Sequence, residues 1–351
     1  MPTSSPWAGD AEAGTDAMEL TEDELVEAIR KVLSGEFPGV QVGIGDDAAV
    51  VDSGTGATVL TSDMLIEGVH FDRSSISARD LGAKSIVVNV SDIAAMGASP
   101  RYAMVSLGIP ADIDAAWVME LFGGMRAACD EYALALVGGD TNRADAIVIA
   151  VAVVGQVVSG HAVTRSGARP GDIVVVTGSL GAAAGGFLLS RIHPSKLLQA
   201  LAEPWGRELV DAQARPVARV GEGQTLARAG ATAMMDLSDG LAKDLSRLCA
   251  ASGVGTRLEL PRVPVAQALR FAAGFLDVDP QELALAGGED YELLATIDLT
   301  NLSRARGDLH ERFGVTLTDV GVIIDKGLVA VDAEGRESPL EPKGWDHFAT
   351  R

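Results

Sequence analysis

Carboxylates that interrupt apolar segments constrain the fold of this 351-residue chain more than any other feature of its sequence. They occur in five stretches, which read GIGDDAAVV, VLTSDML, VVNVSDIAAMG, LVGGDTN and MMDLSDGL. Asp and Glu are almost never fully buried unless they pair with a cation or bind a metal. The chain must therefore either solvate these side chains at the ends of its strands or hold them with positive charge.

Each stretch taken alone has an ordinary structural interpretation. Asp239 precedes the helix-like LAKDL and could belong to its cap, and Asp140 could belong to a Gly-Gly-Asp turn. Most of the stretches have no Lys or Arg within a few residues, so local ion pairing explains them poorly, while distant arginines stay open as partners. Five such stretches in one chain favour a shared site.

The donor atoms in these stretches favour a hard cation. Oxygen ligands without Cys or His at metal-ligand spacing select Mg²⁺, Mn²⁺ or Ca²⁺, and carboxylates that share Mg²⁺ with substrate phosphates are typical of phosphoryl transfer. Strand alternation places Thr61 and Asp63 on one face, and helical spacing places Lys84 and Asp92 on one stripe of the helix expected after Asp80.

Several familiar nucleotide signatures are absent from the sequence. The chain has no Gly-x-x-x-x-Gly-Lys-Ser/Thr loop and no HRD or DFG motif of a protein kinase. GSLGAAAGG at Gly178 lacks the Gly-x-Gly-x-x-Gly spacing of a dinucleotide site, and close helix packing explains its glycines better.

The charge balance limits the classes of partner. With 28 Lys and Arg against 49 Asp and Glu, the formal net charge is −21, which repels nucleic acid and anionic membranes. Anionic substrates stay open as partners, because a bound cation can invert the local field.

Cysteine count, targeting signals and apolar runs bear on where the protein works. Two cysteines are too few for a disulfide framework, and residues 1–18 lack the features of a signal peptide. The longest apolar run, residues 146–158, is too short for a bilayer span. We therefore expect a cytoplasmic protein without a membrane segment, whose residues 1–18 form a disordered extension.

The order of strand and helix patterns predicts a two-domain α/β (α+β) fold. A capping box predicts a helix over residues 21–33, and a further helix should run from Asp80, as its cap, to about residue 96. The turn-rich RSGARPGD, which ends at Asp172, marks the expected domain boundary. We predict a mixed-sheet domain over residues 19–159 and an α/β domain over residues 160–351. Other expected elements are a helix over residues 114–132 and strands over residues 146–158, 172–178, 256–260, 291–297, 316–324 and 328–331.

Eight motifs, taken in chain order, resemble those of the thiamine-monophosphate kinase family. They read GIGDDAAVV, LTSDMLIEGVHF, NVSDIAAMGASP, LVGGDTNR, TRSGARPGD, DLSDGL, GGEDYELL and GWDHF, and the resemblance runs from about Thr21 to Phe348. Several are partly shared by a wider superfamily of ATP-dependent enzymes, which includes aminoimidazole ribonucleotide synthetase, selenophosphate synthetase and a hydrogenase-maturation protein. GVHF, GGEDYE and GWDHF point to the thiamine-phosphate branch, and Asn142, where a second Thr or Ser is usual, is a small departure.

The resemblance implies a reaction and an assembly. The reaction converts ATP and thiamine phosphate to ADP and thiamine diphosphate with several Mg²⁺ ions. Because the acceptor phosphate oxygen is already anionic, we expect direct in-line transfer with no general base and no phosphoenzyme. The N-terminal domain is expected to bind ATP and Mg²⁺ and to form a homodimer through its sheet.

The resemblance also implies three sets of site residues. The magnesium ligands would be Asp47, the Thr61 carbonyl, Ser62, Asp63, Asp92, Asp140, Asp236 and Asp239. ATP would contact Tyr132, Gly139, Asp140, Arg165 and Ser238. Thiamine phosphate would contact His70, Glu289 and Trp345.

These roles are physically reasonable, and several have a structural alternative. Arg165 can grip a phosphate with its planar fork, Trp345 offers a flat face to a cationic ring, and Glu289 can complement the charge of that ring. His70 could instead be a satisfied structural histidine, and Trp345 could anchor the end of the chain. The first carboxylate of the doublet, Asp46, points away from its neighbour in an extended backbone, so it need not bind Mg²⁺ and could simply cap the turn or orient the loop.

Two other functions stay open at this point. The first is another ATP-dependent enzyme of the same superfamily, which would act on a different acceptor. The second is a non-catalytic acidic protein that binds cations, which would scatter its carboxylates over solvated faces instead of placing them in apolar segments.

Overall fold

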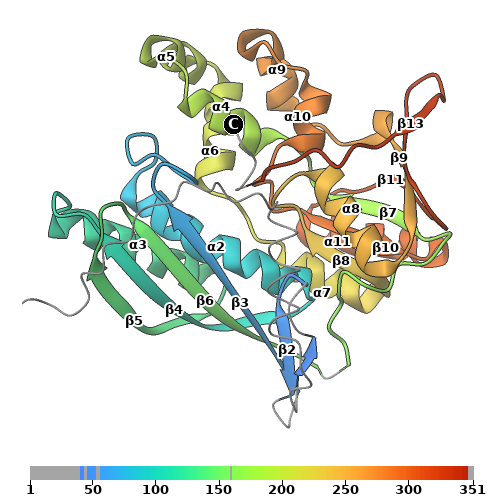
Figure 1. Cartoon of the computed structure of the whole chain (residues 1–351), viewed down its shortest axis with the longest axis horizontal. Helices are drawn as coiled ribbons and strands as arrows, with labels where there is room; N and C mark the ends of the chain where they lie inside the picture. The colour runs from blue at the N-terminus through green and yellow to red at the C-terminus, as the bar shows by residue number, and fades with distance from the viewer. Residues whose placement is uncertain (1–39, 43–45, 53–55, 159, 347–351) are drawn as a thin grey trace, which may run out of the picture. The chain divides into compact units, whose positions relative to one another are not determined.

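Two mixed β-sheets organise the part of the chain that the computed structural model describes, which comprises residues 40–42, 46–52, 56–158 and 160–346 (Figure 1). The expected helix over residues 21–33, the extension 1–18 and the last residues of the GWDHF motif lie outside this part. The sites described below all belong to one compact unit, which ends at Trp345.

The first sheet contains six strands in the order β1-β2-β3-β6-β4-β5. Neighbouring strands are antiparallel, except that β4 and β5 are parallel. The β3–β6 pairing runs along the whole of β3 and fixes the face on which Thr61 and Asp63 lie. The strands are β1 (Val40–Val42), β2 (Ala49–Asp52), β3 (Ala57–Ile66), β4 (Ser99–Ile109), β5 (Ala135–Arg143) and β6 (Val148–Val157).

The second sheet contains seven strands in the order β13-β12-β9-β11-β7-β10-β8. Only β12 and β9 are parallel neighbours within it. Its edge strand β8 ends at Asp236, so the sheet brings one predicted carboxylate to its border. The strands are β7 (Ile173–Thr177), β8 (Ala231–Asp236), β9 (Gly255–Glu259), β10 (Leu293–Ile297), β11 (Leu317–Ile324), β12 (Leu328–Val331) and β13 (Glu337–Pro339).

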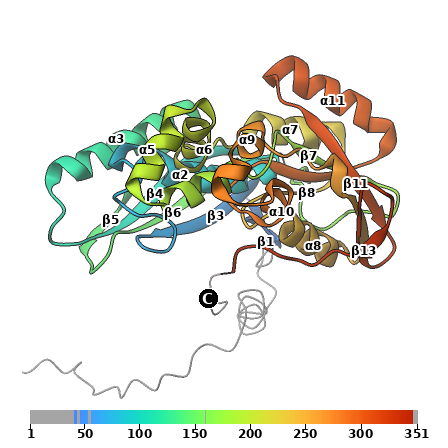
Figure 2. The same ribbon diagram turned by 90° about the horizontal axis from the view of Figure 1, so that it is seen from above.

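Helices cover one face of the first sheet and both faces of the second (Figure 2). The first sheet carries α2 (Ala78–Ala95) and α3 (Ala115–Glu131), and the second lies between α8 (Leu241–Ser252) on one face and α7 (Val220–Ala229) and α11 (Leu299–Phe313) on the other. None of the described helices has the length and apolarity that crossing a bilayer requires. The remaining helices are α4 (Ala182–Ser190), α5 (Pro194–Ala202), α6 (Pro204–Ala214), α9 (Gln267–Leu276), α10 (Pro280–Ala286) and the 3₁₀ helix η1 (Leu260–Arg262).

Helix α2 joins the two sheets. It packs on β3 and β6 of the first sheet and also contacts α7 and β8 of the second domain. The helix begins after Ser77, whose hydroxyl accepts the N–H of Asp80 at 3.0 Å and donates to the carboxylate of Asp80 at 2.7 Å. The expectation that Asp80 caps the helix is wrong by one turn, because the Ser-x-x-Asp spacing places it inside the first turn.

The predicted two-domain α/β class is confirmed, and most predicted elements have their counterparts. The strands expected over residues 146–158, 256–260, 316–324 and 328–331 are β6, β9, β11 and β12. The predicted helix over residues 114–132 is α3. The predicted division of the chain after residue 159 stays a prediction.

Helices α2 and α3 touch backbone to backbone at two glycines. A Cβ at Gly82 would lie 1.9 Å from the carbonyl oxygen of Leu121, and a Cβ at Gly124 would lie 1.8 Å from that of Arg79. Carbon and oxygen atoms cannot approach that closely, so the separation of the helices depends on these glycines. A Cβ at the neighbouring Gly123 would meet only the end of the flexible Arg79 side chain, at 3.1 Å.

We expect Gly124→Ala to lower the free energy of unfolding by about 3 kcal/mol, because the helices must separate to admit the methyl group. Gly123→Ala is the matched control and should be neutral or raise that free energy by up to about 1 kcal/mol, since alanine is the better helix former. Urea unfolding of both variants measures the difference. Equal stability of the two variants would contradict this description of the helix contact.

Candidate active site

Three carboxylates from three separate segments converge in the structure. Asp47 precedes β2, Asp92 lies near the end of α2, and Asp236 ends β8. One ligand oxygen of each lies within 4.8 Å of those of the other two. We call these three residues the carboxylate cluster, and it brings together three of the predicted magnesium ligands.

Arg165 pairs with the cluster through Asp47. Its guanidinium donates to both oxygens of Asp47, at 3.0 Å from Nε and 2.8 Å from Nη2, and its backbone N–H donates to Asp46 at 3.0 Å. Burial opposes the charge of Arg165, but the charge and hydrogen bonds of Asp47 outweigh it and raise the pKa of Arg165. Burial and then the charge of Asp47 raise the pKa of Asp46 to about 6. The two adjacent carboxylates therefore have different roles. Asp47 belongs to the carboxylate cluster, and Asp46 accepts the backbone N–H of Arg165 and so fixes the backbone there.

Hydroxyl groups hold the other two carboxylates of the cluster. The Thr61 hydroxyl donates to Asp92 at 2.5 Å, and the Ser91 hydroxyl donates to Asp236 at 2.6 Å. Burial, followed by the charges of neighbouring carboxylates, raises the pKa of Asp92 and that of Asp236 well above the ordinary value. Because Arg165 pairs with only one of the three carboxylates, Asp47, the ionised cluster carries excess negative charge and favours a cation.

The donor set of the cluster suits a hard cation such as Mg²⁺. Among the described residues, its ligand atoms are all carboxylate oxygens. Asp63 lies close enough for its charge to raise the pKa of Asp92, and the Asn89 side chain accepts the Asp63 N–H at 2.9 Å. Thr61 and Asp63 therefore both face α2, as the strand alternation predicts.

The loop after β8 carries Ser238 and Asp239. Three successive N–H groups of this loop donate to one carboxylate oxygen of Asp244, at 3.0–3.2 Å. Asp239 itself pairs with Arg247 at 2.6 Å and with Lys243 at 3.2 Å. The loop is fixed next to the cluster, and the charge of Asp239 is already balanced by these two cations.

Glu289 forms a salt bridge with a buried lysine. Lys84 Nζ lies 2.8 Å from Glu289 Oε1 and donates to the carbonyl of Gln213 at 2.9 Å, and the Lys84 side chain is 0% exposed. Since Lys84 belongs to α2 and Glu289 to the loop before β10, the pair links the two domains. Because Lys84 neutralises the charge of Glu289, a bound molecule would meet Glu289 as a hydrogen-bond acceptor and not as an isolated negative charge.

Comparisons with known proteins agree with this architecture. The model of the AIR synthase related protein, N-terminal domain, matches residues 45–157, and that of its C-terminal domain matches residues 169–334. The thiamine-monophosphate kinase of Aquifex aeolicus (strain VF5) is 35% identical over 332 residues, which cover 94% of this chain and 99% of that protein. The chain belongs to the thiamine-monophosphate kinase family. The member from Escherichia coli (strain K12) is 37% identical over 320 residues, which cover 89% of this chain and 93% of that protein.

A solved structure gives the same assignment. AaThiL complexed with AMPPCP and TMP superposes with a TM-score of 0.79 at 34% identity, and the match covers 95% of this chain and 100% of that chain. The resemblance to the thiamine-monophosphate kinase family, drawn from the eight motifs, is therefore confirmed. The roles of single residues are not tested by these comparisons and stay predictions.

Some residues predicted from the kinase family lie away from the carboxylate cluster in the single chain. Ser62 is exposed and alternates with Thr61 and Asp63, so it faces the opposite side of β3. Gly139 and Asp140 lie on β5, which β6 and β4 separate from β3 by about 14 Å across the sheet. Their assignments to Mg²⁺ and ATP stay predictions.

Two predicted contacts, His70 and Tyr132, already have structural partners. His70 Nδ1 accepts the N–H of Ile66 at 3.0 Å, so the neutral ring carries its proton on Nε2. The Tyr132 hydroxyl accepts the N–H of Ala218 at 3.0 Å, and burial raises the pKa of Tyr132 to about 12. Both side chains stabilise the local fold, and neither observation tests their predicted binding roles.

Trp345 is placed next to the Asp239 loop. The backbone N–H of Trp345 donates to the backbone carbonyl of Asp239 at 3.1 Å, and Lys243 Nζ donates to the backbone carbonyl of Trp345. The indole meets the Phe187 ring edge-on, with 6.3 Å between the ring centroids. The half-buried indole is therefore anchored next to the loop that carries Asp239, and its role as a substrate contact stays a prediction.

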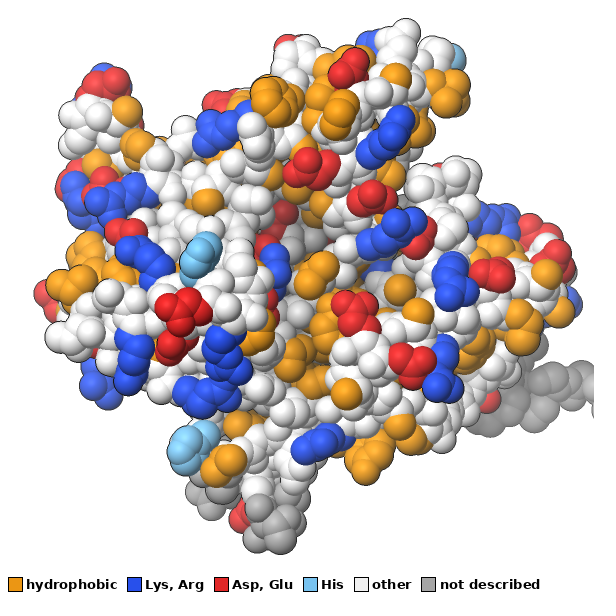
Figure 3. All heavy atoms as spheres, turned by 180° about the vertical axis from the view of Figure 1, so that it is seen from behind, with side chains coloured by type: hydrophobic (Ala, Val, Ile, Leu, Met, Phe, Trp, Pro, Cys, Tyr) orange, Lys and Arg blue, Asp and Glu red, His pale blue; other side chains and the backbone are white. Residues whose placement is uncertain are grey.

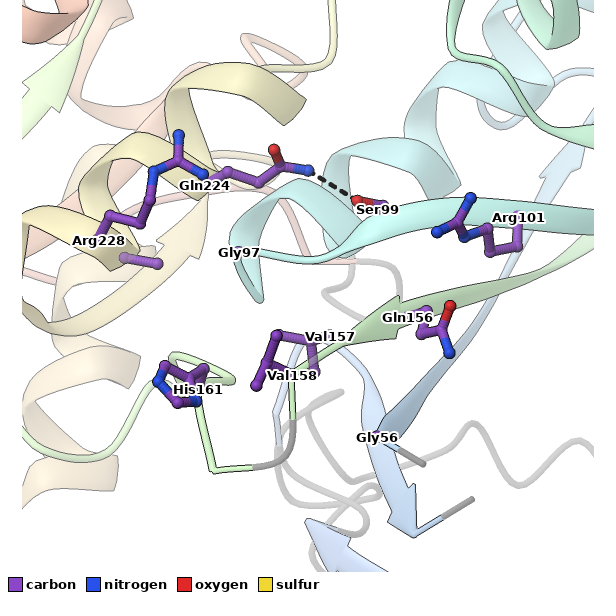
Figure 4. A pocket seen from close by; sticks show the side chains of 11 residues that line it. Gly56, Gly97, Ser99, Arg101, Gln156, Val157, Val158, His161, Gln224 and Arg228 are labelled. Atoms are coloured by element: carbon purple, nitrogen blue, oxygen red, sulfur yellow. Dashed lines mark hydrogen bonds between the residues drawn. The ribbon is translucent and has the colours of Figure 1, made fainter. Parts of the chain in front are cut away.

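A separate pocket of about 440 Å³ lies just beyond the C-terminal end of α2, where Gly97 and Ser99 contribute to its lining (Figure 4). Its described lining includes Arg101, Gln156, Gln224 and Arg228, and none of the described lining residues is a carboxylate. Gln224 donates to the Ser99 hydroxyl at its rim, at 2.9 Å. This pocket shares no residue with the carboxylate cluster and offers no ligand set for Mg²⁺.

Sequence reasoning missed several groups that build the site. Ser91 and Lys84 make contacts to the second domain, and Asp244 and Arg247 fix the loop that carries Asp239. A signal was available, because Lys84 and Ser91 are polar residues that lie among the buried residues of α2. Buried polar groups need partners, so each should have been assigned one.

Two substitutions in the cluster should change the metal-free stability in opposite directions. Asp236→Asn removes a buried negative charge while its amide oxygen can still accept from Ser91, so the free energy of unfolding in EDTA at pH 8 should rise by about 1 kcal/mol or more. Asp47→Asn leaves Arg165, whose side chain is 21% exposed, without its charge partner and should lower that free energy by about 3 kcal/mol.

Chemical denaturation with EDTA present measures both variants against the wild type. A loss of stability in Asp236→Asn similar to that in Asp47→Asn would contradict the account of repulsion in the cluster.

Proposed function

We propose that this chain transfers the γ-phosphoryl group of ATP to thiamine phosphate, forming ADP and thiamine diphosphate, with Mg²⁺ at the carboxylate cluster. Relatives named thiamine-monophosphate kinase, and a relative complexed with AMPPCP and TMP, support these substrates. The observation that carries the proposal is the cluster itself, because three carboxylates within 4.8 Å of one another are costly to bring together without a cation.

Charge neutralisation and positioning are the main requirements of transfer between two polyanions. Mg²⁺ held by Asp47, Asp92 and Asp236 would stabilise the charge that develops on the phosphate oxygens. Arg165 orients Asp47 through two hydrogen bonds, and its place beside the cluster suits a contact with an ATP phosphate. The acceptor oxygen needs no deprotonation, so we assign no general base.

The substrate side of the site would be formed by Trp345, Glu289 and His70. The Trp345 indole offers a face to the cationic ring of thiamine phosphate. Glu289, paired with Lys84, would accept a hydrogen bond from the substrate instead of acting as a lone counter-charge. His70 would donate from Nε2, since its Nδ1 already accepts from the backbone.

The proposal includes a homodimer formed through the open face of the first sheet. Met64, Met104 and Val137 lie on three strands of that sheet and are 49%, 55% and 59% exposed. Exposed apolar side chains gathered on one sheet face are typical of an interface. Figure 3 shows the molecule from behind, where acidic side chains lie interspersed with basic ones. A protein that sediments as a monomer at micromolar concentration would contradict this part of the proposal.

The proposed reaction can be tested with ATP, Mg²⁺ and thiamine phosphate as the only additions. We expect thiamine diphosphate and ADP in equal amounts by chromatography, and EDTA should abolish both. Formation of ADP without thiamine diphosphate would indicate a different acceptor within the superfamily. Absence of both products, from folded protein with saturating Mg²⁺, would exclude the proposed activity.

We expect Trp345→Ala to raise the KM for thiamine phosphate by about 3- to 30-fold, because a cation–π contact of about 0.5–2 kcal/mol is lost. The KM for ATP should stay near the wild-type value. Trp205→Ala is the matched control, since the ring of Trp205 packs on that of Phe275 in α9, with 5.4 Å between the centroids. Steady-state kinetics with each substrate varied in turn provides the comparison, and equal increases in both KM values would indicate a general defect instead.

A further inference from the structure

The loop that carries Glu289 and Tyr291 is held against the segment between Asp236 and Asp239. Glu289 N–H donates to the carbonyl of Ser238 at 2.8 Å, and Tyr291 N–H donates to that of Leu237 at 2.9 Å. The return bond runs from Leu237 N–H to the Glu292 carbonyl at 2.8 Å. The backbone alone therefore places Tyr291 beside the carboxylate cluster.

Two residues of this loop adopt a left-handed backbone. Glu289 has φ 68° and Tyr291 has φ 49°, and only four non-glycine residues in the described chain have positive φ. The other two, Ala133 and Asp277, directly follow helices, where this conformation is ordinary. For a bulky residue it costs on the order of 1–3 kcal/mol, and such strain concentrates at functional sites.

The Tyr291 hydroxyl is buried without a protein acceptor. The residue is 7% exposed, and no acceptor for its hydroxyl exists among the residues that the structure describes. Burial, and then the charges of Glu289 and three aspartates that include Asp63 and Asp236, raise the pKa of Tyr291 well above its ordinary value. The phenol thus stays protonated at neutral pH and remains a donor, although a buried, unpaired hydroxyl costs about 1–3 kcal/mol.

We propose that the Tyr291 hydroxyl donates a hydrogen bond to an oxygen of the phosphoryl group during its transfer. Tyr291 lies between Glu289, on the proposed thiamine side, and the cluster, on the proposed metal side, which is where the two substrates would meet. A neutral donor suits this place, because it stabilises phosphoryl oxygens without competing with a cation for the carboxylates.

The inference rests on the proposed function and adds a catalytic residue to it. In the transfer, an oxygen of thiamine phosphate bonds to the γ-phosphorus, the bond from phosphorus to the bridging oxygen breaks, and its electron pair leaves with ADP. Tyr291 keeps its proton throughout and acts only as a hydrogen-bond donor.

The test is Tyr291→Phe, which keeps the ring and removes the donor. We expect kcat to fall about 100-fold with both KM values near those of the wild type, and Tm to be equal or higher. Thr296→Val is the matched control, because it also removes a buried hydroxyl, but one that accepts from Ala233 N–H at 3.1 Å and bonds Thr232 at 2.7 Å. This control should lose Tm and keep wild-type kinetics.

Wild-type kcat in Tyr291→Phe would overturn the inference, and so would a rise in one KM with unchanged kcat. A loss of Tm with normal kinetics would make Tyr291 purely structural. In each of these cases, wild-type protein that forms thiamine diphosphate leaves the proposed function standing. If the wild-type protein forms no thiamine diphosphate, both the proposed function and the role inferred for Tyr291 are wrong.

Discussion

Repulsion among Asp47, Asp92 and Asp236 sets the conditions that the rest of the structure has to meet. Two unit charges 4.8 Å apart repel by roughly 3 kcal/mol at an effective dielectric constant of about 20. Arg165 balances one of the three charges, and the hydroxyls of Thr61 and Ser91 only orient the others. Because each carboxylate comes from a different segment, the cluster exists only in the folded chain.

Helix α2 carries much of this arrangement. Asp92 belongs to the cluster, Ser91 reaches Asp236, and Lys84 reaches Glu289, so one helix positions groups from both domains. Its packing on α3 through Gly82 fixes the helix against the first sheet. The polar residues of a buried helix are thus explained by partners outside it, which links the packing of the fold to the geometry of the site.

Much of the fold and part of the site could be predicted from the sequence. Strand and helix patterns and the spaced carboxylates depend on local sequence, so the fold class and the members of the cluster were accessible. The pairing of Asp47 with Arg165 joins residues 118 apart, and local patterns do not encode contacts of that range. Lys84 was placed on a helix stripe but not paired with Glu289 for the same reason. Arg247 lies eight residues after Asp239 and was a local signal that went unused.

The carboxylate cluster destabilises the metal-free protein, and Mg²⁺ bound there would relieve this cost. The folded pKa values of Asp92 and Asp236 lie above the unfolded value of 3.8, so their contribution to stability is present below pH 4 and is lost as pH rises through the raised values. Thermal unfolding from pH 5 to pH 8, with EDTA and with Mg²⁺, measures this. We predict that Tm in EDTA falls as pH rises and that Mg²⁺ restores it most at pH 8. A Tm that does not respond to Mg²⁺ at any pH would contradict the account.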